Sequence, residues 1–244
     1  MSFFAIRDLV FEIMFNSLLN SLLDLLLPQK PLARELLAMS PDEFTERAGR
    51  APGNAGKNII SLFDYRVPLV KEAVWMLKYR GNKKIAALLA TLLYEELLAF
   101  LAEYAPLTNF TDPLLIPIPL SRKRERERGF NQCVLLTDEL LRLDISPIKG
   151  STAVLGRRGV IGRNFTLSLA LQKTKDTPSQ TKTESRAERE KNLRGCFAAD
   201  AEVVRGRNII LIDDVATTGA TIDEARRTLR AAGARKVIAF TIAH

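Results

Sequence analysis

The sequence is poor in cysteine and histidine. Its 244 residues include two cysteines, Cys133 and Cys196, and a single histidine, His244. Two cysteines so far apart exclude a disulfide framework and a cysteine-rich zinc site, and they are typical of reduced thiols in a cytosolic protein. One histidine excludes a histidine-based catalytic triad and a multi-histidine metal site. These sites are therefore ruled out before any motif is considered.

The sequence also has relatively few acidic residues. The 36 Lys and Arg residues outnumber the 28 Asp and Glu residues, giving a formal net charge of +8. Such a balance favours anionic partners, either phosphorylated metabolites or nucleic acid, and charge alone does not choose between them. With 47% hydrophobic and 26% charged residues, the chain has the composition of a globular protein with one good core and an appendage.

We expect residues 1–60 to form that appendage, an amphipathic helix and a linker, and residues 61–244 to form the main domain. Residues 1–27 are apolar apart from a polar stripe at every fourth position, which predicts a helix that Pro28 ends. The helix is expected to pack on the protein or on a second copy, with an interfacial membrane helix as the alternative. Its charged stripe argues against a spanning helix, and a small-residue cleavage site is missing. Residues 29–58 are predicted to be linker, apart from a capped helix start at Ser40.

The main domain alternates helical and strand-like segments. Apolar residues at helical spacing predict packing helices at about residues 67–79 and 83–104. Pro117 and Pro119 are inconsistent with a mid-sheet strand, so residues 114–120 are predicted to be a strand that ends in a rigid loop. The long segment 157–185 is predicted to be either a functional lid or disordered, and residues 203–204 an edge strand. A helix at about 220–232 and a strand at 236–243 follow.

The segment from Ser121 to Gln132, SRKRERERGFNQ, is strongly basic. It carries five basic residues against two acidic ones. Taken alone, such a charge run is more often a solvated helix face than a binding site, and both interpretations stay open at this point.

The stretch NIILIDDVATTGAT, residues 208–221, combines features of a ligand site. A short apolar run without alternation suits a strand buried on both faces, as in a parallel sheet. Asp213 and Asp214 follow at its end, and a small hydroxyl-rich loop then leads into a helix. Ligands of open α/β sheets bind outside the carboxyl ends of the strands, which is where this stretch puts its polar groups.

The loop is suited to a phosphate and the acid pair to a sugar. Backbone N–H groups at a helix N-terminus bind anions, Gly219 permits close approach, and three hydroxyls add donors, those of Thr217, Thr218 and Thr221. Adjacent carboxylates accept hydrogen bonds from a sugar diol, directly or through a hydrated Mg²⁺. A phosphorylated ribose therefore fits both halves, with its 5′-phosphate in the loop and its 2′- and 3′-hydroxyls against the acids.

Three other interpretations use similar residues. A phosphoacceptor receiver domain also has an acid pair after a strand, but several βα units follow it, whereas one unit and a strand follow here. A phosphatase-type DxD nucleophile needs a different spacing and also lies early in its domain. A purely structural turn that caps a helix needs only one such acid.

At these residues the chain resembles the type I phosphoribosyltransferases, whose fingerprint is a hydrophobic run, two acids and a TG-containing loop. Within them it resembles the ComF family of competence-associated, phosphoribosyltransferase-like proteins. The supporting segments are LKYRGNKK (77–84), IPIPLSRKRERERGFNQ (116–132), TPSQTKTESRAEREKNLRGCF (177–197) and IILIDDVATTGAT (209–221). The resemblance implies an α/β fold with a mainly parallel sheet flanked by helices, preceded by the N-terminal helical appendage.

The resemblance also implies a role for each segment. Asp213 and Asp214 would hold the ribose and Mg²⁺ of phosphoribosyl pyrophosphate, and Arg128 and a lid at residues 177–189 would add cations around the pyrophosphate. The pyrophosphate loop is expected at residues 117–121, which include Pro119, Leu120 and Ser121. The 5′-phosphate loop consists of Ala216, Thr217, Thr218, Gly219, Ala220 and Thr221.

Two features depart from the family pattern. Family members commonly begin with a cysteine-based zinc module, but no zinc-spaced cysteines follow Pro28 here, so we predict no zinc. Some purine-type transferases carry a carboxylate base inside the phosphate loop, where this chain has Thr217. The acceptor nucleophile is therefore not encoded in any recognisable residue.

The leading expectation is a Mg²⁺-dependent protein that binds phosphoribosyl pyrophosphate and transfers the phosphoribosyl group in a role linked to DNA uptake. One alternative is a sensor that binds the ligand without catalysis. Another is a competence accessory protein that binds single-stranded DNA on its basic surface. We expect a cytoplasmic location, with a peripheral position at the inner membrane face as the alternative.

Overall fold

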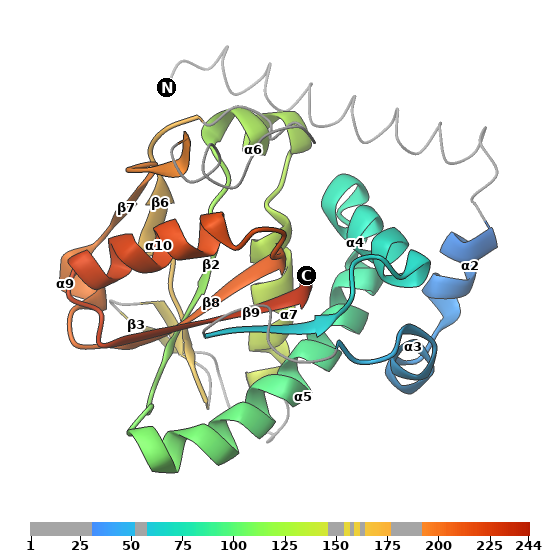
Figure 1. The fold of residues 1–244 in the computed structure, drawn as a ribbon, viewed down its shortest axis with the longest axis horizontal. Helices are drawn as coiled ribbons and strands as arrows, with labels where there is room; N and C mark the ends of the chain where they lie inside the picture. Colours follow the sequence, from blue (N-terminus) through green and yellow to red (C-terminus); the bar gives the residue numbers. More distant parts are fainter. Residues whose placement is uncertain (1–30, 52–57, 146–153, 157–158, 162–163, 177–191) are drawn as a thin grey trace.

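The computed structural model describes residues 31–51, 58–145, 154–156, 159–161, 164–176 and 192–244 (Figure 1). The predicted helix at residues 1–27 and the predicted lid at residues 177–189 lie outside this part of the chain.

A seven-stranded sheet in the order β1-β9-β8-β2-β5-β4-β3 organises the fold. Its first five strands are parallel, and β4 and β3 continue the sheet antiparallel. The strands are β1 (Ile59–Phe63), β2 (Leu114–Pro117), β3 (Val154–Gly156), β4 (Gly159–Ile161), β5 (Thr166–Leu167), β8 (Asn208–Val215) and β9 (Lys236–Ala243). A separate antiparallel pair is formed by β6 (Leu171–Lys173) and β7 (Phe197–Ala199).

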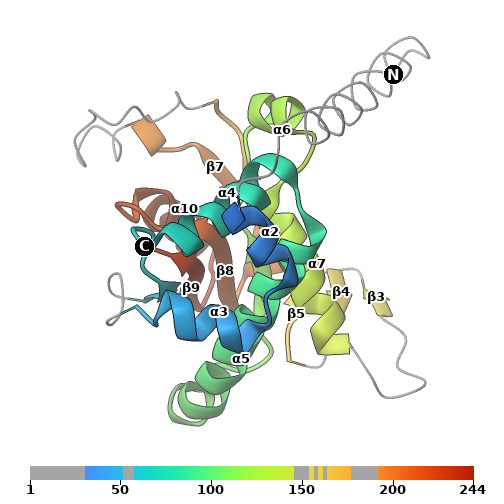
Figure 2. The ribbon, with the colours of Figure 1, turned by 90° about the vertical axis from the view of Figure 1, so that its right-hand side faces the viewer.

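Helices cover both faces of the sheet, which explains the non-alternating apolar run in β8. Ile210 and Ile212 pack with the helices of one face, whereas Ile209 and Leu211 pack on the opposite face. The first face carries α2 (Pro31–Ala38), α3 (Pro41–Ala48), α4 (Pro68–Arg80), α5 (Lys83–Thr108) and most of α7 (Gln132–Ile145). The second face carries α10 (Ala220–Ala231) (Figures 1 and 2). The predicted α/β architecture, a mainly parallel sheet flanked by helices, is confirmed.

The linker prediction for residues 29–58 is wrong at α2, whereas α3 confirms the helix start predicted at Ser40. Ser40 caps α3 as predicted, since its hydroxyl accepts from the Glu43 N–H at 3.2 Å. In α2, Leu36 is buried, and in α3, Phe44 packs edge-on against Phe63 of β1 with ring centroids 5.2 Å apart. Residues of these two helices therefore pack in the same hydrophobic core as β1.

The strand β2 lies in the middle of the sheet, between β8 and β5, which corrects the prediction from its prolines. The N–H of Ile118 donates to Ile212 of β8, so by alternation Pro117 faces β5. The pairing with β5 already ends at Leu115 and Leu167, so the N–H that Pro117 lacks has no strand opposite it. The strand does end at Pro117, as predicted.

Two other predictions fail locally. The expected edge strand at residues 203–204 is the end of the short helix α9 (Ala201–Val204), because Asp200 caps it by accepting from the Glu202 N–H. The described parts of the predicted loop 157–185 contain β4, β5 and β6 rather than irregular chain. These strands are two or three residues long, too short to show a periodicity.

Within the described residues, α5 is the one helix long and apolar enough to cross a membrane. Its residues Ile85, Leu89 and Leu93 are fully buried in the main core, as expected of the core helix of a folded domain.

Candidate functional site

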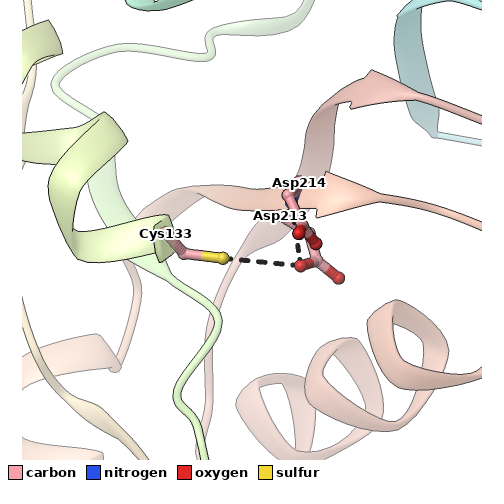
Figure 3. Close-up of side chains that lie close together, drawn as sticks. All are labelled: Cys133, Asp213 and Asp214. Atoms are coloured by element: carbon pink, nitrogen blue, oxygen red, sulfur yellow. Dashed lines mark hydrogen bonds between the residues drawn. The ribbon is translucent and has the colours of Figure 1, made fainter. Parts of the chain in front are cut away.

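The acid pair lies at the carboxyl end of β8 (Figure 3). Asp213 and Asp214 are 8% and 3% exposed. The N–H of Asp214 donates to Asp213 Oδ1 at 2.9 Å, and the N–H of Val215 donates to Asp214 Oδ1 at 3.0 Å. One oxygen of each carboxylate is thus held by the backbone of the strand end.

A buried thiol fixes the first acid. Cys133, in the first turn of α7, donates from Sγ to Asp213 Oδ1 at 3.4 Å (Figure 3). Burial, together with the nearby charge of Asp213, raises the pKa of the Cys133 thiol well above its usual value. The thiol is therefore a proton donor to the carboxylate rather than a nucleophile.

A lysine from α4 reaches the second acid. Lys78 Nζ lies 3.0 Å from Asp214 Oδ2 in an ion pair. Burial, the largest single effect, lowers the pKa of Lys78, but the charge of Asp214, its hydrogen bond to the ammonium and the charge of Asp213 together outweigh burial, and the pKa is raised. The lysine therefore carries a positive charge beside the acid pair.

The acid pair opens into a pocket of about 630 Å³. Seven of the residues predicted for the ligand site line it: Pro119, Leu120, Arg128, Asp213, Asp214, Thr217 and Thr221. Basic residues from three further positions share the lining, namely Lys78, Arg124 and Lys173. The pocket thus combines the acid pair with several cations, and Glu127 adds a third carboxylate to its lining.

The other predicted residues lie beside the pocket rather than in its lining. Ser121 caps α6 (Arg122–Arg128) by accepting from the Arg124 N–H at 3.4 Å, and it lines a neighbouring pocket of about 520 Å³. The remaining four, Ala216, Thr218, Gly219 and Ala220, form the turn into α10. Their position suits backbone contacts to a ligand.

Gly219 is needed at that turn. It has a φ of 76°, a left-handed conformation that favours glycine, and a Cβ there would lie 3.3 Å from Ile59 of β1. The Thr218 hydroxyl accepts a hydrogen bond from the Ala220 N–H at 3.4 Å, which ties the loop to the start of α10. The predicted reason for the glycine, close approach of the backbone to a phosphate, stays a prediction.

Arg128 is held at the pocket by two contacts. Its Nη1 donates to Gln132 Oε1 at 3.0 Å, and its guanidinium lies 5.3 Å from the ring centre of Tyr79. Nearby, Phe130 fills the space beside Gly81, where a Cβ would come within 3.0 Å of its ring. The segments LKYRGNKK and RGFNQ are therefore one packed unit at the edge of the site.

Comparisons with known proteins agree with this arrangement. The phosphoribosyl transferase domain family matches residues 163–244. The competence protein ComFC of Bacillus subtilis is 31% identical over 188 residues, which cover 75% of this chain and 62% of that protein. The DNA utilization protein YhgH of Escherichia coli K12 is 30% identical over 181 residues, which cover 74% of this chain and 69% of that protein. The chain belongs to the ComF family.

Solved structures show only a distant likeness. The allosteric regulatory enzyme of purine biosynthesis aligns with 69% of this chain and 30% of its own, at 16% identity and a TM-score of 0.37. The APRTase of Giardia lamblia aligns with 83% of this chain and 84% of its own, at 15% identity and a TM-score of 0.36. These scores are too low to add to the assignment. The sheet and the domain match give the type I phosphoribosyltransferase-like fold of this ComF-family chain.

Sequence reasoning missed three residues of the site in this ComF-family chain. Lys78 stands in a helix whose periodicity indicates packing, and Cys133 stands inside another helix. Lys173 lies in β6, within the segment predicted to be irregular. For Lys78 the only signal in the sequence is its place in the LKYRGNKK segment on which the family resemblance rests.

The acid pair fits a hard divalent cation. Cys133, Asp213 and Asp214 offer ligand atoms that all lie within 4.8 Å of one another. Mg²⁺ takes oxygen ligands from one or two carboxylates together with water and substrate phosphates, so the two carboxylates suit it and the thiol does not. Asp214 Oδ2 is bound by neither the backbone nor the thiol, so within the described residues a cation that binds it has to displace the ammonium of Lys78.

Burial makes the pair sensitive to pH. Desolvation, and then the charge of Asp214, raise the pKa of Asp213 to about 7 from 3.8, while Lys78 acts in the opposite direction. Between about pH 4 and 7 the folded protein therefore holds a proton that the unfolded chain has released. Because of that proton, the contribution of Asp213 to the free energy of unfolding falls as the pH rises through this window.

We expect the Asp213→Asn variant to gain stability relative to the wild type as the pH rises from 4.5 to 7.5. Urea unfolding of the metal-free proteins at several pH values measures this difference, and the comparison cancels the other titrating groups. A difference that stays constant with pH would contradict the raised pKa.

Proposed function

We propose that this ComF-family protein binds phosphoribosyl pyrophosphate together with Mg²⁺ and transfers the phosphoribosyl group to an acceptor, in a role linked to DNA uptake. The observation that carries the proposal is the pocket in which Asp213, Asp214 and the α10 loop meet a ring of cations. A ligand with a phosphate, a diol and a pyrophosphate matches these three parts.

Each part has a role in binding. The 5′-phosphate lies against the backbone N–H groups at the start of α10 and the hydroxyls of Thr217 and Thr221. The ribose hydroxyls donate to Asp213 and Asp214. The pyrophosphate lies by the loop at Pro119 and Leu120, within reach of Arg128.

The reaction is displacement at the anomeric carbon. The bond from C1′ to the pyrophosphate oxygen breaks with its electron pair, while a bond forms from the acceptor nucleophile to C1′ and the acceptor loses a proton. Arg128 and Lys173 stabilise the negative charge that develops on the leaving pyrophosphate. A bound Mg²⁺ would add charge neutralisation at the same oxygens, held by Asp213 and Asp214. Thr217 stands where some purine-type transferases have a carboxylate base, so this chain does not indicate which acceptor is used.

Calorimetric titration with phosphoribosyl pyrophosphate and Mg²⁺ tests the ligand, and a screen of nucleobases and amines for pyrophosphate release tests the reaction. We expect binding heat and pyrophosphate release with at least one acceptor. A titration without heat would reject the ligand. Binding without release from any acceptor would favour the sensor, which needs the same pocket but no nucleophile.

A second candidate function is single-stranded DNA binding. Two exposed aromatic residues of α4, Trp75 and Tyr79, lie 5.9 Å apart, with Arg80 over the first ring and Arg128 over the second. Exposed rings beside the basic helix α6 are suited to stacking bases along a phosphate backbone. Binding of an oligonucleotide that weakens steeply with salt, and that is lost in a Trp75→Ala/Tyr79→Ala variant, would support this function.

The location is part of the proposal. Cys133 and Cys196 are free thiols, which suits the reducing cytoplasm. The alternative, a peripheral position at the inner membrane face, depends on residues 1–27. We also propose that the protein self-associates through residues 1–27 and that it contacts the competence machinery. We propose that it does not bind zinc.

A further inference from the structure

We propose that Lys78 is an exchangeable counter-ion of the acid pair. In the ligand-free protein its ammonium neutralises Asp214, and on binding it moves to an anionic group of the ligand while the ribose hydroxyls or a divalent cation occupy Asp214. The identity of the ligand rests on the proposed function, whereas the competition between Lys78 and a cation rests on the ion pair itself.

The ion pair belongs to the ligand pocket rather than to the core. Lys78 comes from the last turn of α4 and Asp214 from the end of β8, and both side chains line the pocket of about 630 Å³. The lysine side chain is 28% exposed and the aspartate side chain 4%. The ammonium therefore approaches the acid from the open side, where a ligand would also enter.

The two carboxylates differ in how firmly their oxygens are held. Asp213 Oδ1 accepts from the Cys133 thiol and from a backbone N–H, and Asp214 Oδ1 accepts from the Val215 N–H. Asp214 Oδ2, in contrast, is held among the described residues by the ammonium of Lys78 rather than by the backbone or the thiol. Departure of Lys78 would thus release one acceptor oxygen while the contacts of the other described carboxylate oxygens stay in place.

Lys78 is less constrained than two other cations of the pocket, Arg128 and Lys173. Arg128 is held by Gln132 and by the ring of Tyr79, and Lys173 lies 5.6 Å from the ring centre of Phe197. A lysine ammonium is a compact charge on a flexible four-carbon stem, so it can change partner at little cost in geometry. An anion that enters the pocket meets two positioned cations and attracts a third from Asp214.

The exchange makes the anion and the divalent cation cooperative. A cation and Lys78 compete for Asp214 Oδ2, so each weakens the binding of the other. An anionic ligand that draws Lys78 away removes that competitor and strengthens the binding of the cation, and by linkage the cation strengthens the binding of the anion by the same factor. Without a cation, Lys78 keeps the acid pair from repelling the ligand.

The Lys78→Gln variant separates these effects, and Lys71→Gln is the matched control because Lys71 is exposed on the same helix. Calorimetry with Mg²⁺ alone should show about tenfold tighter binding by Lys78→Gln than by the control, since a charge-assisted contact has been removed from Asp214. Titration with phosphoribosyl pyrophosphate in EDTA should show about tenfold weaker binding. The wild type and the control should match in both titrations.

The outcomes distinguish the inference from the proposed function. A wild type that does not bind phosphoribosyl pyrophosphate rejects the function, while the Mg²⁺ titration still decides the competition. If Lys78→Gln and the control bind Mg²⁺ with equal affinity, or if neither binds Mg²⁺, the proposal that Lys78 competes with a cation for Asp214 is wrong. Tighter Mg²⁺ binding with unchanged ligand affinity overturns the transfer to the ligand.

A measurement on the wild type covers the case in which Lys78→Gln does not fold. In protein labelled with ¹⁵N-lysine, the Nζ resonance of Lys78 should shift on addition of Mg²⁺ alone and shift further with phosphoribosyl pyrophosphate. A resonance that neither addition moves shows that the ion pair stays intact, which overturns the exchange.

Discussion

Replacing both acids, in an Asp213→Asn/Asp214→Asn variant, should lower the affinity for phosphoribosyl pyrophosphate by at least about 100-fold. Asparagine keeps the size of each side chain but removes its charge. Each hydrogen bond to a charged group stabilises by about 1.5–3 kcal/mol, and about 1.4 kcal/mol corresponds to a factor of ten. Two such losses together account for that weakening, and loss of the Mg²⁺ ligands adds to them. Calorimetry with the ligand and Mg²⁺ measures the change.

Asp112→Asn is the matched control for this variant. Asp112 is exposed, outside the residues that line the pocket, and its φ of 44° is one that asparagine also adopts readily. Its affinity for the ligand should equal that of the wild type. Unchanged binding heat in the double variant would show that the acid pair does not hold the ligand, and the assignment of the pocket would fall with it.

Among the substitutions considered, truncation of Phe240 should cause the largest loss of stability. Phe240 lies in β9, is fully buried, and contacts the ring of Phe100 edge-on at 5.3 Å. Phe→Ala in a core removes the transfer free energy of the ring and leaves a cavity, which together cost about 3–5 kcal/mol. Urea unfolding should therefore show Phe240→Ala destabilised by that amount.

Leu107→Ala is the control for Phe240→Ala, because Leu107 is 85% exposed at the end of α5. Removing its side chain should change the free energy of unfolding by less than about 0.5 kcal/mol. If Phe240→Ala lost as little as the control, the packing of α5 on β9 would be wrong. Ligand binding by folded Phe240→Ala would also report how far the sheet supports the site.

The parts of the fold that sequence predicted are those with long, strong patterns. β8 is buried on both faces, which gives a continuous apolar run. A packed helix buries mainly one face, which gives the helical periodicities of α4 and α5, and both patterns can be recognised in the local sequence. The short helix α2 and the strands β5 and β6 have two to eight residues, so packing against distant segments decides their structure. The mid-sheet position of β2 could not be predicted, because it depends on how short β5 is.

The same distinction applies to the site. Asp213, Asp214 and the loop after them are consecutive in the chain, so their chemistry can be recognised in one stretch. Lys78 reaches Asp214 from a distant part of the chain, and the contact exists only because α4 and β8 are packed together. Cys133 is likewise brought to Asp213 by the start of α7. Local patterns therefore predict the acid pair and the loop, but not the groups that neutralise or orient the acids.

The place of β9 in the sheet has a consequence for how the protein forms during synthesis. β9 lies between β1 and β8, and the hydroxyls of Ser61 and Thr241, 180 positions apart, are 2.7 Å from each other. β1 therefore has no neighbouring strand on that side until the ribosome has released the last of these segments. Contacts of such separation close late and slow folding. Asp213 lies in register with Thr241 of β9, so in a nascent chain that still lacks β9 the strand that carries the acid pair has a neighbour on only one side, β2.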